Sequence, residues 1–225
     1  PEGVVWIDLL EPSQAEEKAI ETLLGIEVPT REEMQEIEIS SRLYREGDAS
    51  FMTANILYHA ETPQPRTTAV TFMRTPRATV TLRYADPQSF RQFVARAQRQ
   101  PALLASPDAA LCGILDAVID RAADVLEIGS KDLDTISRNI FGYDKTPDTQ
   151  PDDESDLEDV VRKLGHIEDL NSRIRDSLLS LTRLIAFLTL TMAEQRGTKE
   201  SRTWLKTLAR DVQSLNEQAA FLAHK

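Results

Sequence analysis

The chain has 225 residues, and 41% of them are hydrophobic, which is enough for a sizeable core in one large or two small domains. Its formal net charge of −11 argues against nucleic-acid binding, because an acidic surface repels phosphates. Cation binding and a merely solvated acidic surface both remain consistent with this charge. The single cysteine excludes a disulfide framework, and no uninterrupted apolar run reaches the roughly 18 residues that a membrane span needs.

The first stretch of the chain combines a strand pattern with two helix-start patterns. Residues 4–10 are rich in β-branched and aromatic side chains and predict a strand. Ser13 and Glu16 have the spacing of a capping box, which predicts that a helix begins there. Residues 30–33 repeat this pattern and predict a second helix that continues through Ile37.

Three strand-like runs follow, at residues 51–58, 67–73 and 78–84. In the third run apolar and polar residues alternate, as expected for a strand with two different faces. Asp86 and Pro87 then predict the start of another helix, with the aspartate as the N-cap and the proline in the first turn. The pattern indicates a small sheet flanked by helices.

From Pro107 onward every pattern is helical. Apolar residues three and four positions apart predict one long helix up to about residue 141 and a second over residues 156–195. The loop between them, residues 142–155, is short, so the two helices are expected to form an antiparallel hairpin. Acidic residues gather at its tip, which indicates either simple solvation or attraction of cations or a basic partner: Asp152, Asp153, Glu154, Asp156, Glu158 and Asp159.

The last segment, residues 201–225, carries a heptad seam, in which apolar residues alternate in steps of three and four: Leu205, Leu208, Val212, Leu215, Ala219 and Leu222. Such a seam predicts a helix that packs against another helix, and we expect it to draw copies of the chain together. The segment has no helix stop signal, and the sequence opens without a methionine. We therefore expect a fragment of a longer protein in which this helix continues.

Together these patterns predict a fold of the α+β or α/β class with three parts. Residues 1–105 would form an N-terminal α/β domain, residues 106–196 a long helical hairpin with an acidic tip, and residues 197–225 a stalk helix. No pattern of catalytic residues is present, so an enzyme is not expected. His59, His166 and His224 share no ligand spacing, and Cys112 lies on an apolar helix face, which favours a buried structural thiol.

Three stretches resemble the CorA family of magnesium transporters: the opening VWIDLLEP, the segment TREEMQEIEISSR, and the ending LARDVQSLNEQAAFLAHK. The resemblance covers essentially the whole chain, and the order of its parts agrees. It implies the cytoplasmic, Mg2+-sensing and gating domain of a Mg2+ and Co2+ transporter at the inner membrane. The transmembrane helices and the Gly-Met-Asn pore motif of the family are absent from this sequence.

The resemblance also implies a homopentamer in which a weakly bound regulatory Mg2+ ion, with Co2+ as a second candidate, bridges two subunits. By position, its carboxylate ligands would be Asp86 and Asp211. Each has an ordinary alternative explanation, Asp86 as a helix cap and Asp211 as a charge at the edge of the stalk. Two other functions stay open: the related zinc-transporting branch of the superfamily, and a helical scaffold without metal sensing.

Overall fold

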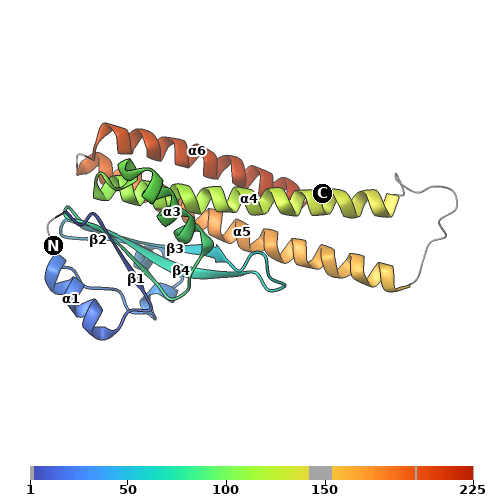
Figure 1. The fold of residues 1–225 in the computed structure, drawn as a ribbon, viewed down its shortest axis with the longest axis horizontal. Coiled ribbons are helices and arrows are strands. Elements are labelled where there is room, and N and C mark those ends of the chain that lie inside the picture. Colours follow the sequence, from blue (N-terminus) through green and yellow to red (C-terminus); the bar gives the residue numbers. More distant parts are fainter. Residues whose placement is uncertain (1–2, 142–153, 196, 225) are drawn as a thin grey trace.

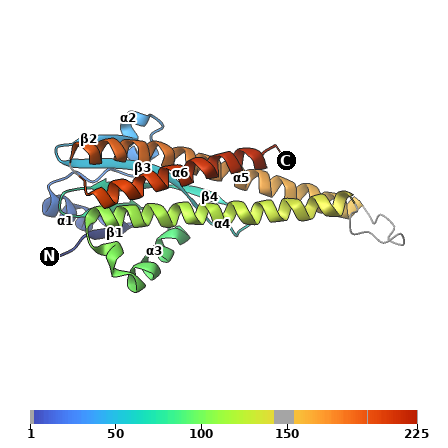
Figure 2. The ribbon, with the colours of Figure 1, turned by 90° about the horizontal axis from the view of Figure 1, so that it is seen from above.

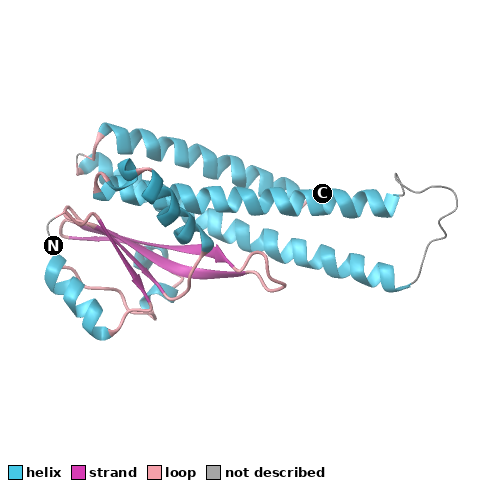
Figure 3. Ribbon diagram, in the orientation of Figure 1, coloured by secondary structure: helices cyan, strands magenta, loops and turns pink. Residues whose placement is uncertain are grey.

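The computed structural model describes residues 3–141, 154–195 and 197–224. A sheet in the first half of the chain lies beneath a layer of long helices, and helix α1 covers the opposite face of the sheet (Figure 1). All the strands of the described residues precede residue 84, and the described chain after Pro107 is helical (Figure 3). The predicted fold class is confirmed.

The sheet has five strands in the order β1-β5-β4-β3-β2. Strands β1 and β5 are parallel, and the other neighbours are antiparallel. The strands are β1 (Trp6–Leu10), β2 (Leu43–Glu46), β3 (Ala49–Tyr58), β4 (Arg66–Arg74) and β5 (Thr79–Arg83). Four of them match the predicted runs, whereas β2 follows no pattern that the sequence analysis identified.

Both faces of the central strands are covered. On one face Phe51, Met73 and Val80 pack with α1, and on the other Met52 and Phe72 join the apolar core that continues into the long helices. Strand β5 is therefore buried along its whole length, although its sequence alternates between apolar and polar residues. Its polar side faces helices instead of water, and its threonines are satisfied by hydrogen bonds such as Thr79 Oγ1 to the Pro107 carbonyl, at 2.8 Å.

The two predicted capping boxes have different outcomes. The first is confirmed: Ser13 and Glu16 exchange hydrogen bonds at the start of α1 (Gln14–Leu24). At residues 30–33 the same bonds form, with Thr30 N donating to Glu33 Oε2 at 2.7 Å, but they open only a 3-10 turn, η1 (Glu33–Gln35). The predicted helix through Ile37 is therefore wrong.

Burial explains why this second helix does not form. Met34 is 2% exposed and Ile37 is 91% exposed, so in the observed structure only the first turn of this segment is held by an apolar contact. A short helix stabilised by its caps alone is marginal in water. The chain instead makes a single turn, α2 (Ile39–Arg42), and enters β2.

Helix α3 (Gln88–Arg99) and the short turn η2 (Pro101–Leu104) connect the sheet to α4 (Pro107–Phe141). The close packing of α3 on α4 depends on Gly113, because a Cβ atom there would lie 2.7 Å from Cε2 of Phe93. Helix α5 (Glu154–Glu194) returns antiparallel to α4, which confirms the predicted hairpin (Figure 1). Most of the predicted loop and the first part of the acidic tip lie outside the described residues.

Helix α6 (Lys199–Leu222) lies over both helices of the hairpin (Figure 2). Its heptad seam is buried there, with Leu205, Leu208 and Ala219 at 0% exposure and Leu215 at 7%. The seam is therefore buried within the chain. From the sequence we had expected it to contact other copies of the chain, and in this structure it is not available for that contact. The apolar stripe of α6 packs on the apolar faces of α4 and α5, which are the nearest ones because they belong to the same chain.

Residues Leu157–Glu194 of helix α5 are long and apolar enough to meet the criteria for a membrane span. The sequence shows no uninterrupted apolar run there, so the analysis of such runs did not identify this segment. A core helix passes the same test, and the residues Leu178, Leu181 and Leu188 are fully buried against the rest of the protein. The division at residues 105 and 196 stays a prediction, since one apolar cluster continues from the sheet into α4, α5 and α6.

Candidate functional site

Asp86, one of the two predicted metal ligands, lies between β5 and α3 and is held by two arginines. Arg83 Nη1 donates to Asp86 Oδ1 at 2.7 Å, and Arg91 Nη1 donates to the other carboxylate oxygen. The side chain makes no capping bond to α3, whose N-cap is Pro87. The predicted capping role of Asp86 is therefore wrong, because the arginines offer stronger, charge-assisted partners.

Arg83 is a rigid anchor for this loop. Its side chain is 7% exposed, lies 4.6 Å from the centre of the Phe90 ring, and binds Asp8 with both Nε and Nη2. Partial burial raises the pKa of Asp86, but hydrogen bonds from Arg91 and Arg83 outweigh it and lower the pKa below its ordinary value. Asp86 is thus ionised at neutral pH, as a cation ligand must be, with both oxygens already engaged.

Asp211, the second predicted ligand, lies on the exposed side of α6, next to the buried Val212. The described part of the chain offers it neither a hydrogen bond nor an ion pair. Its charge acts on Asp120 of α4, where Asp116, Asp120 and Asp124 follow one another at four-residue intervals along one helix face. The sequence analysis missed this row, although the interval of four was visible in the segment DAVIDRAAD.

The acidic row on α4 is only partly neutralised. Arg96 of α3 binds Asp116 at 2.7 Å and Asp120 at 3.4 Å. Burial and the nearby charge of Asp116 raise the pKa of Asp120, Arg96 opposes them, and Asp124 and Asp211 add to the increase. The negative charge of Asp211 therefore reaches α4, and the surface shared by α4 and α6 carries unpaired acidity.

The structure does not gather a complete metal site within one chain. In the described ranges no three His, Cys, Asp or Glu side chains lie close enough together to hold a metal ion. The prediction requires Asp86 and Asp211 from different subunits, so a single chain does not test it, and it stays a prediction. Cys112 is fully buried, and burial above all raises its pKa to about 12, consistent with a structural thiol.

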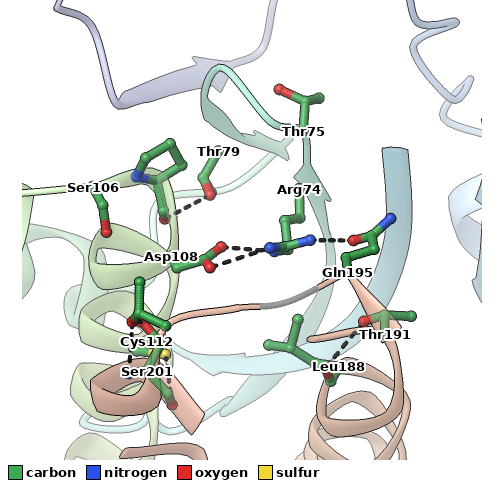
Figure 4. A network of polar contacts seen from close by, with 12 residues as sticks. Arg74, Thr75, Thr79, Ser106, Asp108, Cys112, Leu188, Thr191, Gln195 and Ser201 are labelled. Atoms are coloured by element: carbon green, nitrogen blue, oxygen red, sulfur yellow. Dashed lines mark hydrogen bonds and ion pairs between the residues drawn. The ribbon is translucent and has the colours of Figure 1, made fainter. Parts of the chain in front are cut away.

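A buried polar network ties the sheet to the junction between α5 and α6 (Figure 4). Arg74 of β4 donates to both oxygens of Asp108 on α4, at 2.7 and 3.1 Å, and also to Gln195, which follows α5. Gln195 in turn donates to the Asp48 carbonyl at 3.2 Å. The side chains of Arg74 and Asp108 are only 10% and 13% exposed, so this network joins the sheet to α4 and to the C-terminal end of α5 in a largely dry environment.

Comparison with known proteins places this geometry in a family. A magnesium transport protein CorA of Wolinella succinogenes is 26% identical over 219 residues, which is 96% of this chain and 64% of that relative. This chain therefore spans less than two thirds of the relative's length. The relatives found in this way are named as transporters and not as enzymes.

Solved structures share the fold. The complete CorA magnesium transporter from Methanocaldococcus jannaschii matches with a TM-score of 0.73 at 15% identity, covering 99% of this chain and 66% of that one. The cytoplasmic domain of ZntB from Vibrio parahaemolyticus matches with a TM-score of 0.57 at 10% identity, covering 97% of this chain and 84% of that one. At such identities the likeness shows the fold alone. The family model described as CorA-like Mg2+ transporter protein matches residues 1–225, so the chain belongs to that family.

Proposed function

We propose that this chain is the Mg2+-sensing and gating domain of a CorA-like transporter of Mg2+, with Co2+ as a second transported ion. It would act on the cytoplasmic side of the inner membrane as part of a homopentamer. Membership of the family supports the transporter class. The observation that carries the sensing role is the uncompensated carboxylate of Asp211 beside the acidic row of α4.

Two carboxylates brought within ~4 Å of each other repel by about 4 kcal/mol at an effective dielectric constant near 20. A Mg2+ ion between them removes this repulsion, and its loss restores it. Because Mg2+ keeps most of its water molecules and takes one or two protein carboxylates, each site would be weak. Near-complete switching of a two-state assembly needs ~5.5 kcal/mol of differential binding, which several such sites together supply.

The two proposed ligands differ in how ready they are for a metal ion. Asp211 is exposed and unpaired within the described chain, so it needs no rearrangement. Asp86 has an arginine on each oxygen, but the Arg91 side chain is 60% exposed and the Arg83 side chain only 7%. We therefore propose that a bridging Mg2+ displaces Arg91, while Arg83 keeps holding Asp86 in place.

Sedimentation of the chain with and without millimolar Mg2+ tests this proposal. We expect Mg2+ to favour larger assemblies and to protect α6 from protease, because a ligand stabilises the state that it binds. Asp211→Asn should weaken both responses. Arg91→Gln should strengthen them, because it frees one oxygen of Asp86. Glu168→Gln removes one exposed charge from α5 and serves as the matched control.

An unchanged Mg2+ response in the Asp86→Asn, Asp211→Asn double variant would remove both residues from the mechanism. A parent chain that stays monomeric and indifferent to divalent ions would favour the helical scaffold. A response to Zn2+ at concentrations where Mg2+ has no effect would favour the zinc-transporting branch, for which the present support is the shared fold alone.

A further inference from the structure

A second site of interest is a hollow of about 590 Å3. It lies between the η1–α2 segment, the strands β3 and β4, and helix α5. It has no part in the metal proposal above. Its walls combine arginines with hydroxyl and amide groups, and they come from segments far apart in the sequence. The groups that the argument uses are Arg31, Arg42, Asn55, Tyr58, Thr67 and Arg183.

Arg42 is oriented by a chain of hydrogen bonds and still has an unsatisfied donor. Its Nη2 donates to Asn55 Oδ1 at 2.7 Å, and Asn55 Nδ2 donates to Asp176 Oδ2 at 2.8 Å. Asn55 thus separates the guanidinium from the carboxylate. The Nε atom of Arg42 is buried and has no acceptor in the described structure. Because Nε is closed to solvent, a ligand in the hollow would contact Arg42 through its Nη atoms.

The hollow is positive in a protein that is strongly negative. Its ionisable lining consists of three arginines against the two carboxylates of Glu36 and Asp176, a balance of 3 − 2 = +1, while the whole chain carries −11. Arg183 is exposed and makes no hydrogen bond or ion pair within the described ranges. Burial lowers the pKa of Arg42, Asp176 opposes this shift, and the positive charge of Arg183 adds to it. Arg183 therefore adds positive charge beside Arg42, and the carboxylate of Asp176 offsets it.

We infer that this hollow binds a small phosphorylated organic molecule, with its phosphate held between Arg42 and Arg183. The planar guanidinium group presents several donors in a geometry that matches phosphate oxygens. The volume falls within the range of about 300–1,000 Å3 that is usual for small-molecule sites, and it leaves room for more than one inorganic ion. The hydroxyls of Tyr58 and Thr67 have no partner in the described chain, so they are available to a sugar or similar polar group.

Calorimetric titration of the chain tests this inference, with AMP and ribose 5-phosphate as probes and adenosine and ribose as their phosphate-free counterparts. Mg2+ is left out, so that metal chelation contributes no heat. We expect saturable binding of the phosphorylated probes with one site per chain, and none of the counterparts. Arg183→Gln should weaken binding about tenfold, the effect of losing one charge-assisted hydrogen bond. Arg175→Gln, an equal loss of charge on the same helix but outside the hollow, should change binding less than about twofold.

Three results would overturn the inference: no saturable binding of either phosphorylated probe, equal binding of adenosine and AMP, or equal weakening by Arg183→Gln and Arg175→Gln. The last would show attraction to the overall charge instead of a site. Nuclear magnetic resonance locates the binding independently, because the side-chain amide of Asn55 should shift on addition of AMP. Since these titrations contain no Mg2+, they succeed or fail separately from the metal-sensing proposal.

Discussion

The helical layer has an inner part, which lies on the sheet, and an outer part, which extends beyond it. We define the inner part as residues 107–126 of α4, residues 170–192 of α5 and the whole of α6. The outer part is residues 127–141 of α4 and residues 154–169 of α5. Within the described residues, helix α6 ends beside Gly129, where Leu222 Cδ2 lies 3.7 Å from the position of an added Cβ atom, and α4 and α5 continue outward beyond it (Figures 1 and 2).

Similar apolar patterns have different fates in these two parts. In the inner part Leu178, Leu181 and Leu184 are all at 0% exposure. In the outer part Ile140 is 55% exposed and Leu157 is 67% exposed, although both belong to predicted helix faces. A hollow of about 390 Å3 also lies beside α4 and α5 there. Burial therefore depends on how many elements cover a helix: in the outer part Ile136 and Ile167 are only 7% exposed, while other apolar residues of the two helices stay in water.

Truncation of one leucine in each part should give the largest difference. Leu178→Ala removes fully buried methyl groups and should lower the free energy of unfolding by about 2–5 kcal/mol. Leu157→Ala, at 67% exposure, should change it by less than about 0.5 kcal/mol. Urea unfolding followed by circular dichroism measures both. Similar losses in the two variants would show that the outer part is covered by something beyond the contacts of this chain.

Amide hydrogen exchange should show the same contrast within a single helix. In α4, the amides of residues 110–126 lie under α6 and beside the sheet, whereas those of residues 130–140 have α5 as their main neighbour. Exchange by local opening is faster where fewer buried contacts must break. We expect protection to fall along α4 toward its C-terminal end, as measured by mass spectrometry of peptides. Uniform protection along the helix would contradict a difference in coverage.

The smallest expected effect concerns the acidic row of the inner part. Because the folded-state pKa of Asp120 is raised, its contribution to stability is present below the unfolded-state pKa and is lost as the pH rises through the folded-state value. At neutral pH the ionised group therefore weakens the fold. Asp120→Asn should increase the free energy of unfolding at pH 7, by less than about 0.5 kcal/mol because the side chain is 66% exposed.

Lowering the pH checks the sign of this effect. The advantage of Asp120→Asn should shrink as the pH falls through the raised folded-state pKa of Asp120, and it should be gone below about 4, where the aspartate is protonated in the folded and the unfolded parent protein. Glu158→Gln, on the exposed surface of the outer part, is the control and should leave the stability unchanged at both values. A destabilised Asp120→Asn protein at pH 7 would mean that the contact with Arg96 outweighs the repulsion.

Local patterns predicted local structure well where the packing agreed with them. The capping box at Ser13 and Glu16 begins a helix because Ile20, further along it, reaches the core. The equivalent bonds at Thr30 and Glu33 form as well, yet the helix ends at once, because Ile37 has nothing to pack against. A capping pattern specifies its own hydrogen bonds, and the length of the helix depends on tertiary contacts.

The candidate metal site shows the same limit. The resemblance identified Asp86 and Asp211 by their place in the chain, but it said nothing of the arginines on Asp86 or of the acidic row that faces Asp211. The arginine-lined hollow had no signal at all in the sequence. Arg42 and Arg183 are 141 positions apart, 183 − 42, and they become neighbours only when α5 folds back over the sheet.

The sequence by itself determined the order and type of most elements, with residues 33–46 as the exception, because the period of apolar residues and the turn residues act over a few positions. It also determined the family, through short stretches spread over the whole chain. The tertiary structure alone decided which apolar seam is buried, which helix face stays exposed and which charges meet. These outcomes depend on contacts between distant segments. The heptad seam of α6, for example, is buried because it packs against α4 and α5 of the same chain.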